Sequence, residues 1–395
     1  MSQTTLGEAL FATAARHGAA RAIDDGRQRL TWAELAGRAC RAGAVLRGLG
    51  LGKGDRFALW LPNSLAYVEA GLGAALIGAV VVPINTRLKP PEAEYILRKA
   101  GARVLLTADA FLDVDYVAAA RMIDAPALET VLGASLDGGI SDWDAMLAAV
   151  APAEAAAVRE ASRMVGPDDV AEVIFTSGTT GFPKGAVIRH GQIARAYAFY
   201  AERAGIGPGD RYLIVAPMFH SFGWKAGVVV STLAGAAMYP MAAFDADAAL
   251  RLIEAERITV MGGPPTIFIT LLDLARRTGR DLTSLRSIVL GGSMIPADLV
   301  RTLRQEIGVA VVLSAYGLTE TTALVTMARA DDTVERIATT SGQVVPGMRM
   351  RTVDPEGRPL GPGRRARFRR RGPTSCPATS GTRSGQPRPL RRTAG

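Results

Sequence analysis

The 395-residue sequence predicts an α/β fold built from two units in which strands and helices alternate. Short apolar runs such as Phe57–Leu61 and Ser287–Leu290 have the length and composition of buried strands. Helical patterns separate these runs, and strands that alternate with helices of this length pair in parallel through βαβ crossovers. From about residue 340 the pattern changes, because Met348–Val353 alternates and Asp354–Gly357 has good turn chemistry. A small antiparallel segment is therefore expected after the α/β body.

The first unit is expected over residues 10–165. Thr31 and Glu34 have the spacing of a capping box, which predicts a helix start, and the glycine-rich run 50–54 ends that helix. The elements expected after it are a strand over Phe57–Leu61, a helix over Ser64–Ile77, strands over Val80–Val82 and Val104–Leu106 with a helix over Pro91–Ala100 between them, and an alanine-rich surface helix over Ala145–Ala161.

The second unit is expected over residues 166–340 and repeats the scheme, with residues 341–363 beginning the antiparallel segment. The alternation is clear enough to place each element by its apolar run or its helical spacing. Strands are expected over Val173–Thr176, Arg211–Ala216, Thr259–Met261 and Ser287–Leu290, and helices over 191–204, 245–256 and 297–307.

The formal net charge of +9 is confined to one end of the chain. Residues 364–395 contain ten arginines and no acidic residue, whereas residues 1–363 contain 36 basic and 37 acidic residues. A nearly neutral body argues against a nucleic-acid partner. We also expect no signal peptide and no membrane span, since the most apolar stretch, Ala70–Val82, is shorter than the roughly 20 residues that a spanning helix needs. The two cysteines, Cys40 and Cys376, favour a reducing compartment, so a cytoplasmic protein is expected.

One segment, Phe175–Gly185, carries the chemistry of a phosphate-binding loop. Clusters of Gly, Ser and Thr are usually linkers, but here they follow an apolar strand directly and include a lysine. Backbone amides, hydroxyl groups and one ammonium group together suit a polyphosphate. The segment is not a Walker A loop, because Gly185 follows Lys184 where that motif has Ser or Thr. The groups that could bind a phosphate are the amides near Gly178, Gly181 and Gly185, the hydroxyls of Thr176, Ser177, Thr179 and Thr180, and the ammonium group of Lys184.

The whole eleven-residue string resembles the phosphate loop of the AMP-forming adenylate superfamily, which includes acyl-CoA synthetases, adenylation domains and luciferases. Tyr316–Glu320 resembles the second nucleotide motif of that family. The resemblance implies that Tyr316 lies against adenine, with Gly317 beside it, and that Thr319 bonds the α-phosphate. It also implies that Glu320 and Thr176 bind the Mg²⁺ ion. A hard carboxylate oxygen suits Mg²⁺ chemically. The catalytic set that the resemblance implies is Lys184, His220, Thr319 and Glu320.

Two further segments extend the resemblance to the substrate side. Leu290–Pro296 is similar to the loop whose backbone frames the adenine and acyl pocket, which implies nucleotide contacts at Gly291, Gly292 and Ser293. Pro217–Gly227 is similar to the segment that borders the acyl pocket, and His220 falls near the substrate carboxylate, where it acts either by packing or by electrostatics. No charged side chain occurs in Gly262–Ile269, which favours an apolar acid. The substrate pocket is expected to be lined by Phe219, His220, Trp224, Gly263 and Pro264.

The finer pattern resembles actinobacterial fatty-acid-type CoA ligases, some of which act on propanoate side chains of steroid ring fragments. This implies the large N-terminal domain of adenylate-forming enzymes: two βαβ subdomains with mixed sheets flanked by helices, and a small antiparallel barrel piece. It also implies ATP, Mg²⁺ and CoA as cofactors and co-substrate, and activation of a fatty or related hydrophobic acid to acyl-AMP and then acyl-CoA. Two alternatives stay open: loading of a carrier protein, or a non-catalytic nucleotide-binding remnant. The acyl chain and the oligomeric state, a homodimer included, are not determined by the sequence.

The resemblance covers residues 10–363 and then stops. The family continues with an aspartate that grips the ribose, a hinge and a small C-terminal domain with a catalytic lysine, and none of these is recognisable in residues 364–395. Three interpretations compete for this segment: a disordered Arg/Pro-rich tail, a nucleic-acid-binding arm, and a segment translated out of frame. We favour the last, because back-translation recovers family-like strings in alternative frames. Weak or absent adenylation by this chain is therefore expected.

Overall fold

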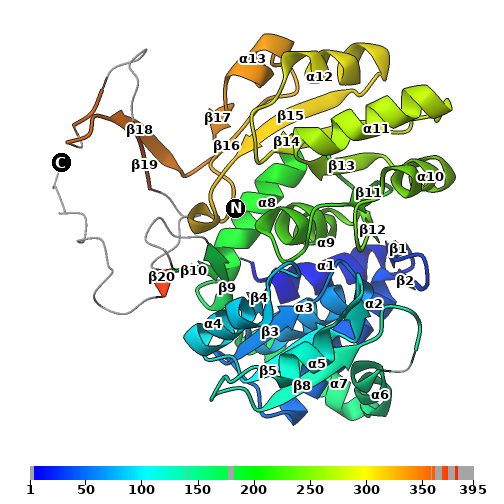
Figure 1. Cartoon of the computed structure of the whole chain (residues 1–395), viewed down its shortest axis with the longest axis vertical. Helices are drawn as coiled ribbons and strands as arrows, with labels where there is room; N and C mark the ends of the chain where they lie inside the picture. Colours follow the sequence, from blue (N-terminus) through cyan, green and yellow to red (C-terminus); the bar gives the residue numbers. More distant parts are fainter. Residues whose placement is uncertain are drawn as a thin grey trace.

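The computed structural model describes residues 4–139, 141–176, 182–356, 358–360, 367–371 and 379–380. Its two large β-sheets lie one above the other and are flanked by helices (Figure 1). Both sheets are mixed: each has a parallel centre, with antiparallel strands at one margin of the lower sheet and at both margins of the upper sheet. The predicted α/β class is confirmed, and the alternation of strand and helix along the chain is the reason for the parallel centres.

The lower sheet in Figure 1 has seven strands in the order β20-β10-β9-β4-β3-β5-β8. Strands β9, β4, β3, β5 and β8 run parallel, while β10 is antiparallel to β9. Its central strands are buried on both faces, as expected for a parallel sheet covered by helices. The strands are β3 (Arg56–Trp60), β4 (Val80–Pro83), β5 (Val104–Ala108), β8 (Thr130–Ala134), β9 (Val170–Thr176), β10 (Lys184–Arg189) and β20 (Thr379–Ser380).

The upper sheet has nine strands in the order β17-β16-β15-β14-β13-β11-β12-β1-β2. Its centre, from β1 to β15, is parallel, and β2, β16 and β17 add antiparallel margins. Two small antiparallel pairs lie outside both sheets. The strands are β1 (Arg21–Asp24), β2 (Arg29–Thr31), β11 (Arg211–Ile214), β12 (Ala237–Pro240), β13 (Val260–Gly263), β14 (Ser287–Gly291), β15 (Val311–Tyr316), β16 (Thr326–Met327) and β17 (Gln343–Val344), with the pairs β6 (Ala110–Phe111) and β7 (Val114–Asp115), and β18 (Arg349–Val353) and β19 (Arg367–Arg371).

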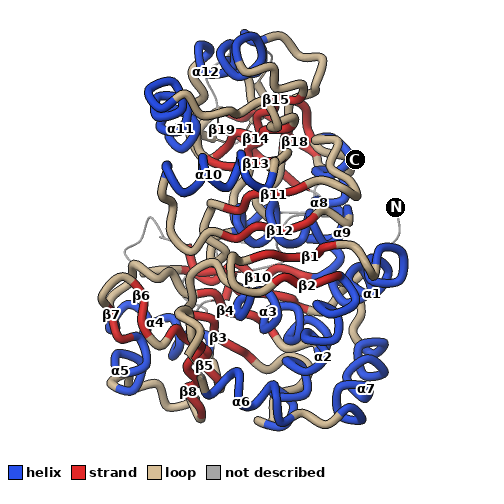
Figure 2. The backbone as a smooth tube through the Cα atoms, turned by 90° about the vertical axis from the view of Figure 1, so that its right-hand side faces the viewer, coloured by secondary structure: helices blue, strands red, loops and turns tan. Residues whose placement is uncertain are grey.

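The helices fill the space around the sheets, as the tube view shows (Figure 2). Helices α2 and α3 cross at glycines: a Cβ atom on Gly73 would lie 2.6 Å from the Cβ atom of Ala42, so only glycine allows this approach. The helices are α1 (Leu6–His17), α2 (Trp32–Gly48), α3 (Leu65–Ile77), α4 (Pro90–Ala100), α5 (Tyr116–Arg121), α6 (Asp142–Ala149), α7 (Pro152–Ala161), α8 (His190–Arg203), α9 (Val230–Ala234), α10 (Ala246–Glu256), α11 (Pro265–Thr278), α12 (Ala297–Arg301) and α13 (Val334–Thr339), with π-helical segments Phe222–Val229 and Thr302–Glu306 and 3₁₀ turns Ser162–Met164 and Thr319–Thr321.

Each sheet takes strands from both halves of the sequence. β1 and β2 come from the first predicted unit but extend the upper sheet, where Ile23 pairs with Met238 on β12. Conversely, β9 and β10 follow residue 165 but extend the lower sheet, where Val81 on β4 pairs with Glu172. The two sheets therefore do not correspond to contiguous units divided at residues 165 and 166. Local sequence patterns indicate that a segment forms a strand, but they do not determine which other strand it pairs with.

Several local predictions can be checked directly. The capping box at Thr31 and Glu34 is confirmed, since the side chain of each residue bonds the backbone of the other. The single helix expected over Ala145–Ala161 is wrong: α6 ends at Ala149, and α7 begins at Pro152, which lacks the N–H that a continuous helix would use. Within the segment 364–395, for which a disordered tail was one of three interpretations, residues 367–371 form β19 paired with β18 and residues 379–380 form β20 paired with β10. The other residues of this segment lie outside those described.

Candidate active site

A cavity of about 990 Å³ opens where parallel strands of the two sheets end. Thr176 ends β9 of the lower sheet, and Gly291 ends β14 of the upper sheet, and both line the cavity. The crevice outside the carboxyl ends of parallel strands is the usual ligand site of open α/β sheets. The segment 216–222, which follows β11, forms a further wall.

The structure brings together a large part of the predicted site and places the rest around it. Residues of the predicted set that line the cavity are Thr176, Phe219, His220, Pro264, Gly291, Gly292, Gly317, Thr319 and Glu320. Those that are described but do not line it are Lys184, Trp224, Gly263, Ser293 and Tyr316. Ser177, Gly178, Thr179, Thr180 and Gly181 lie outside the described residues.

The two ends of the predicted phosphate loop are adjacent at the cavity. β9 and β10 pair antiparallel, with Thr176 opposite Lys184. Helix α4 supports this edge, because the Tyr95 hydroxyl donates to the Pro183 carbonyl oxygen at 3.2 Å and the Tyr95 ring stacks on Phe182 with ring centroids 5.6 Å apart. The ammonium-bearing residue and the hydroxyl-bearing residue are thereby held on neighbouring strands.

Glu320 and Thr176 meet across the boundary between the two sheets. The Thr176 hydroxyl donates to a carboxylate oxygen of Glu320 at 3.5 Å. Glu320 lies in the 3₁₀ turn directly after β15, and two non-glycine residues with positive φ, Thr322 and Ala323, follow it at 59° each. Strained backbone of this kind persists only where its surroundings enforce it.

The turn after β15 is enforced by two contacts. The Tyr197 hydroxyl on α8 donates to the Thr322 carbonyl oxygen at 2.9 Å. A Cβ atom on Gly317 would lie 2.1 Å from the backbone of Ala323, so the chain can double back only with glycine at this position. The glutamate is therefore placed by packing from α8 and by the close approach of two backbone segments.

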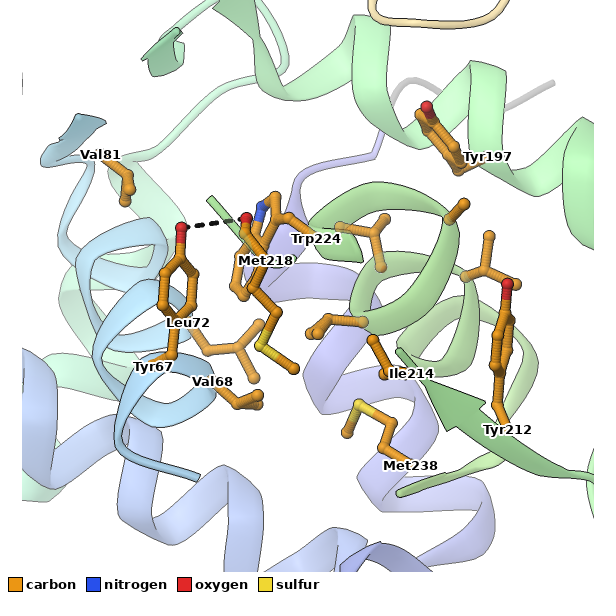
Figure 3. Close-up of a cluster of buried hydrophobic side chains, with 14 of the residues drawn as sticks. Tyr67, Val68, Leu72, Val81, Tyr197, Tyr212, Ile214, Met218, Trp224 and Met238 are labelled. Atoms are coloured by element: carbon orange, nitrogen blue, oxygen red, sulfur yellow. Dashed lines mark hydrogen bonds between the residues drawn. The ribbon is translucent and has the colours of Figure 1, made fainter. Parts of the chain in front are cut away.

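The wall that carries His220 is held by residues of the lower half of the molecule. Asn63 accepts a hydrogen bond from the Met218 amide at 2.7 Å, and the Tyr67 hydroxyl donates to the Met218 carbonyl oxygen at 3.1 Å (Figure 3). Loss of hydration and the nearby Lys225 ammonium group lower the pKa of His220 below its usual value. At neutral pH its imidazole is therefore neutral.

Behind this wall lies an ion pair that sequence reasoning missed. Glu172 on β9 and Lys225 in the π-helical segment Phe222–Val229 are 2.5 Å apart, with side-chain exposures of 3% and 0%. Lys225 also donates to the Ser221 hydroxyl at 3.0 Å. The only sequence signals were a charged residue inside an apolar strand and a lysine inside an apolar helical run. π-Helical turns occur frequently at functional sites.

Trp224, predicted to line the substrate pocket, lies in the core instead. Its ring centroid is 5.7 Å from that of Tyr67, and it occupies the space beside Gly71, where a Cβ atom would be 2.6 Å from the indole (Figure 3). The aromatic residues that do line the cavity from α8 are Tyr197 and Tyr200, which the sequence analysis did not single out. Their three-residue spacing on a helix, which places both on one face, was the available signal.

Comparisons with known proteins place this site in a family. The model of the AMP-binding enzyme family matches residues 10–376, and the chain belongs to this family. The family membership predicted from the motif strings is thereby confirmed.

Similar proteins of known function are acyl-CoA ligases. A 3-[(3aS,4S,7aS)-7a-methyl-1,5-dioxo-octahydro-1H-inden-4-yl]propanoyl:CoA ligase of Mycobacterium tuberculosis is 42% identical over 83% of this chain, and a ligase of the same name from Rhodococcus jostii is 39% identical over 89%. The chain spans 64% of the first relative's length and 69% of the second's. The N-terminal domain of FACL13 from Mycobacterium tuberculosis superposes with a TM-score of 0.82 at 26% identity, covering 95% of this chain and 91% of that one.

Two absences complete the description of the site. No helix in the described part of the chain is long and apolar enough to cross a membrane. Among the residues described, no group of three or more His, Cys, Asp or Glu side chains forms a metal cluster.

Proposed function

We propose that this site binds ATP and a carboxylic acid and forms an acyl adenylate, which the whole protein converts to an acyl-CoA thioester. The observation that carries the proposal is the meeting of Thr176 and Glu320 at the strand ends of a cavity large enough for nucleotide and acid. Family membership supports it, because the two similar ligases activate a propanoic acid carried on a fused-ring diketone. We propose the same acid, here called the diketone acid, as the substrate class.

The donor set at Thr176 and Glu320 fits Mg²⁺. The ion prefers hard oxygen ligands and is usually held by one or two carboxylates together with phosphate oxygens and water. Glu320 would supply the carboxylate and Thr176 the hydroxyl, 3.5 Å apart. When bound there, Mg²⁺ would offset negative charge on the phosphates.

The chain's own residues are suited to holding the reactants in place. In the reaction a carboxylate oxygen of the acid bonds to the α-phosphorus, the bond to pyrophosphate breaks and its electron pair leaves with pyrophosphate, so no protein nucleophile is needed. We assign Thr319 to the phosphates and Lys184 to charge stabilisation, as the motifs indicate. Neutral His220 can donate an N–H hydrogen bond to the acid without cancelling the charge that makes the carboxylate a nucleophile.

The test measures binding and turnover separately on the full chain. The binding probe is the sulfamoyl-adenosine ester mimic of the diketone acyl adenylate, titrated calorimetrically. Turnover is measured by ATP–pyrophosphate exchange with the diketone acid. We expect saturable binding of the mimic and of ATP, and slow ATP–pyrophosphate exchange. In the presence of Mg²⁺, Glu320→Gln should weaken the binding of ATP. Absence of binding by both ATP and the mimic would refute the proposal.

A further inference from the structure

A buried hydroxyl group at the cavity has few hydrogen-bond partners on the protein. Tyr200 on α8 lines the cavity and its side chain is 1% exposed. Within the described structure its hydroxyl oxygen has no hydrogen-bond partner other than the neighbouring Tyr212 phenol. Tyr197, one turn earlier on the same helix, differs in this respect because its hydroxyl is bonded to the Thr322 carbonyl oxygen. Buried polar groups without partners are uncommon, and each calls for a physical explanation.

A second phenol converges on the same place. A Cβ atom built on Gly262 of β13 would lie 2.5 Å from the Tyr212 hydroxyl oxygen and 3.4 Å from both the Tyr200 hydroxyl oxygen and the Phe222 ring. Glycine at this position leaves room beside two hydroxyl groups in an otherwise aromatic corner. Tyr212 comes from β11 and Tyr200 from α8, so the corner lies between the sheet and the helix that covers it.

The Tyr200 hydroxyl is a permanent hydrogen-bond donor. Burial and the neighbouring Tyr212 phenol raise the pKa of Tyr200 well above its usual value, so the group stays protonated at neutral pH. Phe219, Phe222, Pro264 and Ile267 also line the cavity, and none of them can accept the proton through a side chain. When a ligand enters without an oxygen, the donor has only the neighbouring Tyr212 phenol as a possible acceptor.

We propose that the Tyr200 hydroxyl, oriented by Tyr212, donates a hydrogen bond to a carbonyl oxygen on the ring system of the acid, and so selects an oxidised ring acid over a hydrocarbon acid of the same shape. The inference rests on the proposed function, because the ligand is its substrate. Tyr200 is then a specificity-determining residue for the end of the acid remote from its carboxylate. A site built to bond a polar substrate group discriminates against analogues that lack it, because its own group is left unpaired.

The experiment compares two ligands on three proteins. The ligands are the sulfamoyl-adenosine mimic of the diketone acyl adenylate and its dideoxo counterpart, in which both ring ketones are replaced by methylene groups. The proteins are the full chain, Tyr200→Phe, and Tyr239→Phe as a control. Tyr239 is also a buried tyrosine, but it does not line the cavity and its hydroxyl bonds Arg21 and Glu256. Dissociation constants are measured by calorimetry.

The original chain is expected to bind the diketone mimic about tenfold more tightly than the dideoxo mimic, the size of one satisfied buried hydrogen bond. Tyr200→Phe should abolish that ratio by weakening only the diketone mimic, and Tyr239→Phe should keep it. Equal affinities of the unmodified chain for the two mimics, or a ratio retained in Tyr200→Phe, would overturn the inference while leaving the proposed function in place. Binding of neither mimic to the unmodified chain would overturn both. The ligand comparison on the unmodified chain decides the question even where Tyr200→Phe does not fold.

Discussion

Replacing Lys225 with methionine should destabilise the protein strongly, because it leaves the Glu172 carboxylate buried without its counter-ion. The two side chains are exposed by only 0% and 3% and lie 2.5 Å apart. At an effective dielectric constant of about 20, two unit charges at this separation attract by about 7 kcal/mol, and the desolvation of both charges offsets a large part of this. Breaking a buried pair from one side typically costs about 3–5 kcal/mol.

The expected shift in melting temperature follows from the size of the chain. An unfolding entropy of about 2.1 cal/mol/K per residue gives about 0.8 kcal/mol/K for 395 residues. Lys225→Met should therefore lower the melting temperature by about 4–6 °C in a thermal scan monitored by tryptophan fluorescence. The double variant Glu172→Gln/Lys225→Met should regain at least half of this loss, since neither side chain then carries a charge.

The double variant makes this reasoning refutable. If Lys225→Met melts within about 1 °C of the unmodified chain, the pair does not compensate a buried charge. The loss of melting temperature in the double variant can be compared with the summed losses of Lys225→Met and Glu172→Gln measured alone. If the two are equal, the cost comes from lost packing rather than from an isolated carboxylate. Either result would also remove the support for a rigid wall behind Ser221 and His220.

Three further predictions concern other parts of the molecule. Burial lowers the pKa of His190 to about 4, so as the pH falls below about 6.5 the unfolded chain takes up a proton before the folded chain does. The free energy of unfolding should therefore decrease by about 2 kcal/mol between neutral pH and pH 5. His190→Gln should show a smaller loss of melting temperature between pH 7 and 5. Gly317→Ala should weaken ATP binding at least tenfold, since its Cβ atom would meet the Ala323 backbone, and unchanged calorimetric affinity would contradict this. Glu320→Gln should remove the enhancement of ATP affinity by Mg²⁺ while leaving the melting temperature within about 2 °C, and a retained Mg²⁺ effect would place the ion elsewhere.

Local patterns were enough to predict the individual strands and helices. Apolar runs bounded by Pro or Gly gave β3 and β14 to within one residue, and Thr31 marked the start of α2. The break at Pro152 carried a signal too, because proline at the first position of a helix begins a new helix. The strand order was not predictable in the same way, since pairing of β1 with β12 joins segments far apart in the chain.

In the candidate site, too, the residues within sequence motifs could be predicted, whereas the surroundings of each side chain could not. Thr176, Thr319 and Glu320 were found because their order along the chain matches the motif strings, and the structure places all three at one cavity. Trp224 was misplaced, because a bulky residue in a matching string cannot reveal whether its ring faces a cavity or the core. The sequence around Tyr200 is that of an ordinary core aromatic residue. Only the three-dimensional structure shows that its hydroxyl has no partner other than the Tyr212 phenol.

The residues that position the site lie mainly outside the motif strings and act across the junction of the two sheets. Asn63, Tyr67 and Glu172 belong to the lower half, yet they hold the segment that carries His220 after a strand of the upper sheet. Thr176 ends a lower strand and bonds Glu320, which follows an upper strand. A displacement of one sheet relative to the other would therefore separate Thr176 from Glu320 and release the segment that carries His220. Because these polar contacts span the junction together with the connecting helices α2 and α8, the relative position of the two sheets is itself part of the site's geometry.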